Sequence, residues 1–416
     1  MEMKTLLLLL AIGTYPALAA NHYVRAGGSG NGSDWSNACG EFTGACSAGS
    51  LVRGDIYFVG TGTYAGRTWN TPASGTSLIT IKHATVSDHG TSTGWNDGYA
   101  GQAVWTNRNT FTTGYWTFDG ATGDYLTSGI GSYGFQFSYP IGSAGAQFQA
   151  SYITLRYIDC SGYTGTGNYN YPDQAKCIEA YGGDNWTVSH VAMHGCESCL
   201  QGGGDGFLLE YCFIYNSRSI SSNFHNNIFY MSGGSNGVIR YNIVWDYNAE
   251  GFFLTGYNGP DHDIKIYGNV MYGTGTESDY PRGVEIRQDY SYSNIQVYNN
   301  TFSMVDGVAN RAPETGNTCT GCVFRNNIVY QYSFTAADAT ADNNTVDSVN
   351  RFVDLAKKDF HLAAPLAGAA LAAEFNTDMA GNLRGGDGVW DRGAYEFVTG
   401  RPQTIQPPTA VTVTVR

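Results

Sequence analysis

The sequence reads VIRYNIVW at residues 238–245, IKIYGNVMY at 264–272, IQVYNNTF at 295–302 and VFRNNIVY at 323–330. These four phrases are copies of one pattern, in which an asparagine follows an apolar residue by three positions and precedes an apolar or β-branched residue. The asparagines are Asn242, Asn269, Asn300 and Asn327, at spacings of 27, 31 and 27 residues. The chain therefore contains an internal repeat, which fades upstream, where Cys212, Val191 and Ile158 take the asparagine position.

A second phrase precedes each copy of the first. Its copies are KCIEAYGG, SCLQGGG, IFYMSGG, GFFLTG, GVEIRQ and GVANR. Their alignment places six apolar residues in one column: Ile178, Leu200, Phe229, Phe252, Val284 and Val308. Each repeat thus holds several strands too short to bury a face alone, so the repeats must stack on one another. We predict an all-β chain folded as a right-handed parallel β-helix, a solenoid.

The repeated asparagine has a physical role in such a fold. A tight bend between two strands needs a left-handed backbone conformation, which asparagine tolerates. Stacked side-chain amides can also hydrogen-bond from turn to turn, which satisfies polar groups inside the coil. We therefore expect the four asparagines to adopt the left-handed conformation and to form a ladder.

The composition limits the partners of the chain. It has 416 residues, a formal net charge of −13, 55 glycines and only 14% charged residues. A strongly acidic balance disfavours nucleic acid as a partner. The 42% apolar fraction argues against general disorder.

The first residues predict the compartment. Lys4 precedes an apolar run at 6–12, and the small-residue site Ala17-Leu18-Ala19 follows, so we expect residues 1–19 to be a signal peptide. No later stretch is long and apolar enough for a membrane span. We predict a secreted protein, extracellular or periplasmic and monomeric, with one β-helix domain over residues 20–397. Residues 398–416, rich in Pro and Thr, are interpreted as a linker or tail.

Nine cysteines in an exported chain are expected to be mostly oxidised, with at least one left over. We predict the local disulfides Cys39–Cys46 and Cys319–Cys322. Cys177 and Cys199 occupy equivalent positions in consecutive turns, which also allows a disulfide. An alternative pairing among Cys160, Cys196 and Cys212 stays open. For both CxxC spacings we favour a structural role over zinc binding or thiol redox chemistry.

Both ends of the mature chain resemble those of secreted bacterial β-helix proteins of the pectate lyase type. The resemblance rests on NHYVRAGGSGNGSDWSNA (21–38) and GDIYFVGTGTY (54–64) at the start, and on FVDLAKKDFHL (352–362) and DMAGNLRGGDGVWDRGAYEF (378–397) at the end. With the repeats, it covers about residues 21–397. It implies that a polysaccharide substrate lies along one sheet, here the sheet of the second phrase. The RxPxxR signature of the main pectate lyase family and the polygalacturonase set are missing.

Ionisable residues gather in the second phrase. Strand alternation places one outward column at Glu179, Gln201, Tyr230, Phe253, Glu285 and Ala309. Within three consecutive turns we therefore expect a candidate catalytic set of His225, Tyr230, Glu250, Arg282, Glu285 and Arg287, with His225, Glu250 and Arg282 on loop ends. The alternative is an ordinary surface ion pair, worth up to about 1 kcal/mol.

Two chemistries fit these residues. A lyase acting on a uronate needs a cation for the carboxylate, for which Arg282 and Arg287 are suited, and a base for the C5 proton, for which Tyr230 or His225 is suited. A hydrolase needs two carboxyl groups, and Glu250 with Glu285 is the available pair. We predict an acidic-glycan lyase, with the hydrolase as the alternative.

Non-catalytic glycan binding, as in an adhesion protein, is the third hypothesis. Phe253 and Tyr257 are candidates for stacking on sugar rings, and Arg311 extends the positive patch that an anionic polymer requires. No cofactor is predicted with certainty. The segment Asp261-His262-Asp263 resembles in composition the DPHD motif of mannuronan epimerases, and its oxygen-rich side chains are alternatively a calcium ligand set.

Overall fold

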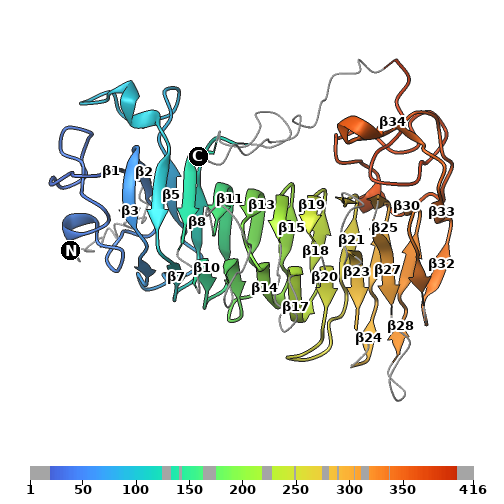
Figure 1. The fold of residues 1–416 in the computed structure, drawn as a ribbon. Helices are drawn as coiled ribbons and strands as arrows, with labels where there is room; N and C mark the ends of the chain where they lie inside the picture. Colours follow the sequence, from blue (N-terminus) through green and yellow to red (C-terminus); the bar gives the residue numbers. More distant parts are fainter. Residues whose placement is uncertain are drawn as a thin grey trace, which may run out of the picture.

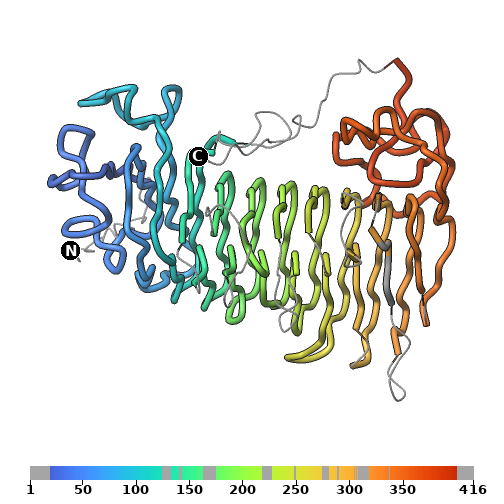
Figure 2. The backbone as a smooth tube through the Cα atoms, in the orientation of Figure 1, coloured from blue at the N-terminus to red at the C-terminus, as the bar shows by residue number. Residues whose placement is uncertain are grey.

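The structure is a computed structural model of the chain. It describes residues 19–123, 133–139, 143–162, 175–217, 227–247, 250–273, 281–287, 290–303, 305–310, 318–336 and 338–400. The described part is a coil of short strands that advances turn by turn along one axis (Figure 1). The smooth backbone trace in Figure 2 follows the same regular winding from the N-terminal turns to the C-terminal ones.

Three parallel sheets run the length of the coil. Sheet 1 contains β1 (Asn21–Val24), β2 (Ile56–Val59), β5 (Ile79–His83), β8 (Trp116–Asp119), the first halves of β11 (Ile153–Ser161) and β13 (Thr187–His194), β15 (Leu208–Glu210), β18 (Val238–Arg240), β21 (Lys265–Tyr267), β25 (Gln296–Tyr298), β29 (Val323–Arg325) and β32 (Thr340–Asp342).

Sheet 2 contains β3 (Gly62–Ala65), β6 (Ala103–Thr106), β9 (Phe135–Ser138), the second halves of β11 and β13, β16 (Phe213–Ser217), β19 (Ile243–Tyr247), β22 (Val270–Tyr272), β26 (Thr301–Ser303), β30 (Ile328–Tyr330) and β33 (Thr345–Asp347). The long strands β11 and β13 pair with members of both sheets, so sheets 1 and 2 are joined there.

Sheet 3 contains β4 (Thr68–Trp69), β7 (Asn109–Phe111), β10 (Ala144–Phe148), β12 (Lys176–Ala180), β14 (Ser198–Asp205), β17 (Asn227–Ser235), β20 (Glu250–Leu254), β23 (Arg282–Ile286), β27 (Asp306–Asn310) and β31 (Thr335–Ala336). The remaining elements are the parallel pair β24 (Tyr292–Ser293) and β28 (Cys319–Thr320), the antiparallel pair β34 (Phe352–Asp354) and β35 (Asp359–Leu362), and the 3-10 helices η1 (Gly44–Cys46), η2 (Asp97–Ala100), η3 (Leu355–Lys357) and η4 (Ala373–Phe375).

This arrangement confirms the predicted right-handed parallel β-helix. Sheet 3 is the sheet of the second phrase, and its register aligns Ile178, Leu200, Phe229, Phe252, Val284 and Val308 as expected from the sequence. The first five of these side chains are fully buried in the interior of the coil. Their burial explains the register, because a slip by one residue would expose every one of them.

An asparagine ladder lies at the bend between sheets 1 and 2, as predicted. Asn242 donates its backbone N–H to the side-chain oxygen of Asn269 at 2.9 Å, and the same contact links Asn269 to Asn300 and Asn300 to Asn327 at 3.0 Å. The side-chain amides donate along the same line. Asn344, which the sequence analysis missed, extends the ladder by one turn.

The expectation that the ladder asparagines are left-handed was wrong. The left-handed residue is the one before each of them: Tyr241, Gly268, Asn299, Asn326 and Asn343 have φ between 50° and 65°. The bend itself thus falls one position earlier. The ladder residue that follows is buried in the first four of these turns, and its side-chain amide also donates to a carbonyl inside the coil, as that of Asn300 does to Ile266.

A closing segment of residues 348–397 packs on the outside of sheets 1 and 2. Three of the left-handed residues bind it. Asn299 donates to the Asp391 carbonyl at 2.8 Å, Asn326 donates to the Ala369 carbonyl at 2.7 Å, and the Tyr241 hydroxyl donates to the Thr377 carbonyl at 3.0 Å. Arg384 is buried within the segment, where its guanidinium donates to the carbonyls of Gly393 and Ala394. These contacts leave the outer face of sheet 3 on the other side of the coil.

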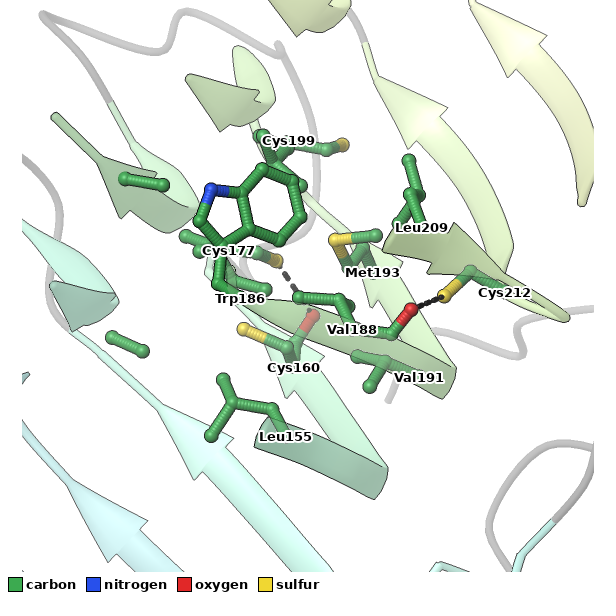
Figure 3. Packing of buried hydrophobic residues seen from close by; sticks show 14 of the residues in the cluster. Leu155, Cys160, Cys177, Trp186, Val188, Val191, Met193, Cys199, Leu209 and Cys212 are labelled. Atoms are coloured by element: carbon green, nitrogen blue, oxygen red, sulfur yellow. Dashed lines mark hydrogen bonds between the residues drawn. The ribbon is translucent and has the colours of Figure 1, made fainter. Parts of the chain in front are cut away.

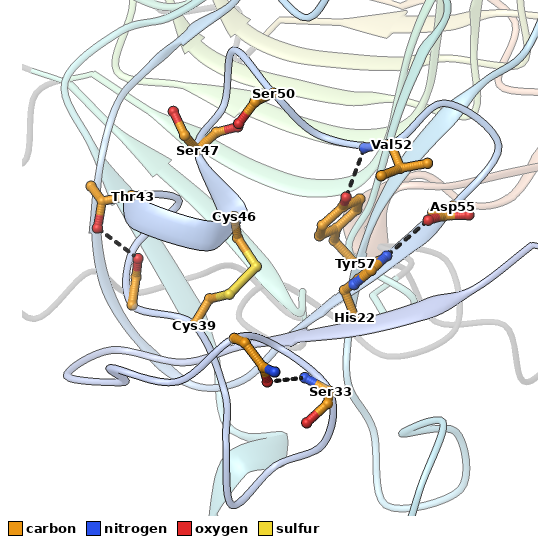
Figure 4. Close-up of a disulfide and its surroundings, with 12 residues drawn as sticks. His22, Ser33, Cys39, Thr43, Cys46, Ser47, Ser50, Val52, Asp55 and Tyr57 are labelled. Carbon is orange, nitrogen blue, oxygen red and sulfur yellow. Dashed lines mark hydrogen bonds and ion pairs between the residues drawn. A yellow bond between two sulfur atoms is a disulfide. The ribbon is translucent and has the colours of Figure 1, made fainter.

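The predicted disulfides Cys39–Cys46 and Cys319–Cys322 are confirmed, and the first fastens the N-terminal segment beside Tyr57 (Figure 4). Cys196 and Cys199 form a third, so both CxxC pairs are disulfides.

The Cys177–Cys199 pairing was wrong, and so was the alternative among Cys160, Cys196 and Cys212. Cys196 reaches Cys199 across the local bend, with their Cα atoms 5.1 Å apart. The Cys177 thiol instead donates to the Cys160 carbonyl inside the core, at 3.0 Å (Figure 3). Cys160, Cys177 and Cys212 are free and buried.

Replacing one rung of the ladder tests its contribution to stability. We expect Asn300→Ala to lower the free energy of unfolding by about 3 kcal/mol, because it leaves buried groups of Asn269 and Ile266 without their partner. The exposed Asn70→Ala is the control, with a change below about 0.5 kcal/mol. Urea unfolding followed by circular dichroism measures both, and equal losses would contradict the ladder's role.

Candidate functional site

The outer face of sheet 3 carries its polar side chains in two columns three residues apart. This spacing arises because two consecutive side chains of each strand face the core, as Cys177 and Ile178 do in β12. In β20 the first of these positions is Gly251, where an added Cβ would lie 2.5 Å from the Met271 methyl group. The residues on either side of an inward pair can then meet outside, as Lys176 meets Glu179 in β12 and Arg282 meets Glu285 in β23.

Glu250, Arg282 and Glu285 converge in one ion cluster across β20 and β23. The Arg282 guanidinium contacts the Glu285 carboxylate and lies 3.7 Å from a Glu250 oxygen. Glu250 and Arg282 were expected on loop ends, but they are the first residues of their strands and are paired in register. The Tyr247 hydroxyl donates to the Arg282 carbonyl at 3.0 Å and fixes the start of β23 from inside.

The predicted outward column is in register, but two of its members are not exposed. Glu179, Gln201, Tyr230, Phe253, Glu285 and Ala309 align across six strands. Glu285 is only 1% exposed, since it lies against the Arg282 guanidinium. Phe253 is also buried, and its ring meets that of Tyr230 edge-on, with centroids 5.8 Å apart. Tyr230 is half-buried.

The remaining residues of the predicted site lie outside the strands of sheet 3 or outside the described part of the chain. Arg287 is exposed directly after β23, and Tyr257 is 72% exposed in the loop after β20. His225 and Arg311 lie outside the residues that the structure describes. Most of the segments 215–227 and 273–282, which precede β17 and β23, lies outside them as well.

A second polar cluster, which the sequence analysis did not include in the site, lies on β10 and β12 and at Arg108, directly before β7. Glu179 is its centre: Lys176 Nζ lies 3.1 Å from one oxygen, and Gln147 donates to the other at 3.1 Å. The Arg108 guanidinium lies 3.7 Å from the same carboxylate. The inward pair brings Lys176 next to Glu179, as it brings Arg282 next to Glu285. In both pairs an oppositely charged residue follows after three positions, and this spacing was visible in the sequence.

The Asp261-His262-Asp263 segment has a structural role in the loop that carries Tyr257. Asp261 is buried and accepts the backbone N–H of Gly234 at 2.6 Å and that of Gly256 at 3.2 Å. Burial raises the pKa of its carboxyl group to about 6, against the opposing effect of these hydrogen bonds. Asp263 is turned away toward Asn294, so the segment does not fit a calcium ligand set. Across the described ranges, no group of three His, Cys, Asp or Glu side chains is placed to hold a metal ion.

Comparisons with known proteins support the fold. No protein-family model and no curated protein matches the sequence. Among solved structures, pectate lyase Pel9A has a TM-score of 0.61 at 16% identity, over 92% of this chain and 97% of that one. A PL6 family polysaccharide lyase from Pseudopedobacter saltans follows, with a TM-score of 0.41 at 11% identity, over 79% and 95% of the two chains.

The first likeness shows a pectate-lyase-like β-helix scaffold, and the second carries no further argument. Within the described parts of the chain there is no helix with the length and apolarity of a membrane span.

Removing the central cation of the Glu250 cluster tests whether it is built as described. We expect Arg282→Met to lower the free energy of unfolding by about 3 kcal/mol, because it leaves two buried carboxylates without this partner. The double variant Arg282→Met/Glu285→Gln should recover part of the loss. The exposed Arg287→Met is the matched control, and a loss as large as that of Arg282→Met would contradict the assignment.

The raised pKa of Asp261 predicts a pH-dependent stability. Because the folded state holds this proton more tightly than the unfolded state, the contribution of Asp261 weakens as the pH rises from about 4 to about 6. We expect Asp261→Asn to remove this pH dependence, which amounts to about 3 kcal/mol in the free energy of unfolding. Urea unfolding of both proteins between pH 4 and 7 measures it, and parallel curves would rule out the assignment.

Proposed function

We propose that the protein is an exported polysaccharide lyase that cleaves an acidic, uronate-containing glycan by β-elimination on the outer face of sheet 3. The observation that carries the proposal is the convergence of Glu250, Arg282 and Glu285 on this face, beside the ring pair of Tyr230 and Phe253. The scaffold and the three disulfides are compatible with an extracellular enzyme.

The ion cluster decides which arginine is offered to the substrate. Two protein carboxylates already surround the Arg282 guanidinium, so its charge is compensated within the protein. Arg287 is exposed at the end of the same strand. We assign carboxylate binding to Arg287 because its side chain is exposed next to this cluster and its planar fork matches a uronate carboxylate. Arg282, Glu250 and Glu285 act as positioning residues that hold β23 against β20.

Tyr230 is assigned as the base. It lies in the outward column two turns from Glu285, a separation of about 10 Å. One sugar residue together with the long Arg287 side chain spans such a distance. A uronate whose carboxylate is bound by Arg287 therefore has its C5 proton directed toward Tyr230. The edge-on contact with Phe253 orients the Tyr230 ring. His225 is the alternative base, and Phe253 and Tyr257 are assigned to substrate binding together with Arg311.

The same geometry makes a hydrolase less suitable. Hydrolysis by Glu250 and Glu285 requires the glycosidic bond to lie between the two carboxyl groups. The Arg282 guanidinium occupies the space between them, since it contacts both. A lyase uses this cluster as a fixed support and leaves the exposed cation and the tyrosine for the substrate.

The activity is tested by incubating the protein with polygalacturonate, alginate and glycosaminoglycans while the ultraviolet absorbance of an unsaturated product is followed. We expect Tyr230→Phe to lower kcat/KM at least about 100-fold, because proton transfer is lost. Tyr152→Phe, at an exposed tyrosine directly before β11 of sheet 1, is the control and should keep full activity.

Other outcomes separate the alternatives. New reducing ends without the absorbance would indicate the hydrolase. Binding without any cleavage would indicate an adhesion protein, and neither binding nor cleavage would exclude all three functions. Full activity of Tyr230→Phe with loss in His225→Ala would move the base to His225.

A further inference from the structure

The cluster around Glu179 leaves one cation available to a ligand. Lys176 is only 6% exposed and lies 3.1 Å from the Glu179 carboxylate, so it is the close, buried counter-ion. Arg108 lies farther away, at 3.7 Å, and its side chain is 44% exposed. Glu179 carries one negative charge against two cations. The guanidinium of Arg108 has five N–H donors, and Glu179 engages it only loosely, so donors remain directed to solvent.

Uncharged donors border Arg108 on the same face. Gln149 is exposed and donates to the Gln147 oxygen at 2.9 Å, and Gln147 donates to Glu179. This relay fixes both amides on the outside of β10. Directly after β12, burial together with the charge of Glu179 raises the pKa of Tyr181, so its hydroxyl stays protonated as a donor.

The cluster is continuous with the proposed catalytic face. Glu179 is aligned with Gln201, Tyr230, Phe253 and Glu285 through four strand pairings. Four steps at the spacing of paired strands amount to about 19 Å. An extended glycan lying along the coil axis thus passes from Arg287 over Tyr230 to Arg108.

We propose that Arg108, with Gln149 and Tyr181, forms a distal subsite that binds the anionic group of a sugar residue several units from the cleaved bond. This inference rests on the proposed function, because it assigns both sites to one acidic glycan. The chemistry is that of a carboxylate or a sulfate ester held by a guanidinium fork and neutral donors. Lys176 serves the subsite indirectly, since it compensates Glu179 and keeps Arg108 available.

Calorimetric binding of long oligouronates to the Tyr230→Phe protein tests the subsite without cleavage. We expect Arg108→Ala to weaken binding about tenfold, and Glu179→Gln to strengthen it several-fold, because the isosteric change removes the competing anion. Arg156→Ala is the matched control: this arginine is 46% exposed and paired with Asp119 on sheet 1. Its removal should leave the affinity unchanged. Sulfated oligosaccharides, run in parallel, distinguish a sulfate from a carboxylate.

The failures are distinguishable. If the Tyr230→Phe protein binds long chains with the same affinity with and without Arg108→Ala or Glu179→Gln, the subsite is overturned. Ultraviolet activity of the wild-type protein on polyuronates would then leave the lyase proposal standing. An Arg108 effect without any unsaturated product from the wild-type protein would keep the subsite as a glycan-binding site and overturn the lyase. Equal weakening by Arg108→Ala and Arg156→Ala would indicate general charge attraction and would also overturn the subsite.

Discussion

Five stacked asparagine side chains fix how the turns of this chain lie on one another. Each accepts the backbone N–H of the equivalent residue in the turn before it, which for Asn242 is Cys212. Each also donates to a carbonyl inside the coil. Because every contact joins equivalent positions of consecutive turns, the ladder sets the register of the turns from Cys212 to Asn344. A one-residue slip would therefore break the ladder and at the same time expose the apolar column of sheet 3.

The site depends on that register. Lys176 and Glu179, and four turns later Arg282 and Glu285, meet because each strand of sheet 3 turns two consecutive residues inward. Stacking then places Glu250 beside Arg282 and Tyr230 beside Phe253. A chain with a net charge of −13 thereby presents two local cations, Arg287 and Arg108, on one face. An acidic protein can bind an acidic polymer only through such local concentration of positive charge.

The sequence predicted the stacking, because apolar columns and repeated asparagines leave a periodic trace. It did not predict the bend position: the residue before the ladder is left-handed, and Gly268 was the signal in the sequence. It also misjudged Cys177, because equivalence between turns brings Cα atoms close without deciding where a thiol points. The burial of Glu285 was not predictable either, since it depends on how the long Arg282 side chain folds over its own strand.

A crystal structure of the Tyr230→Phe protein with a long acidic oligosaccharide would test the account most directly. The account predicts a glycan parallel to the coil axis on sheet 3, with one carboxylate at Arg287, another anionic group at Arg108 and a sugar ring beside residue 230. A glycan bound across sheets 1 and 2, or one that runs around the coil instead of along it, would contradict the account.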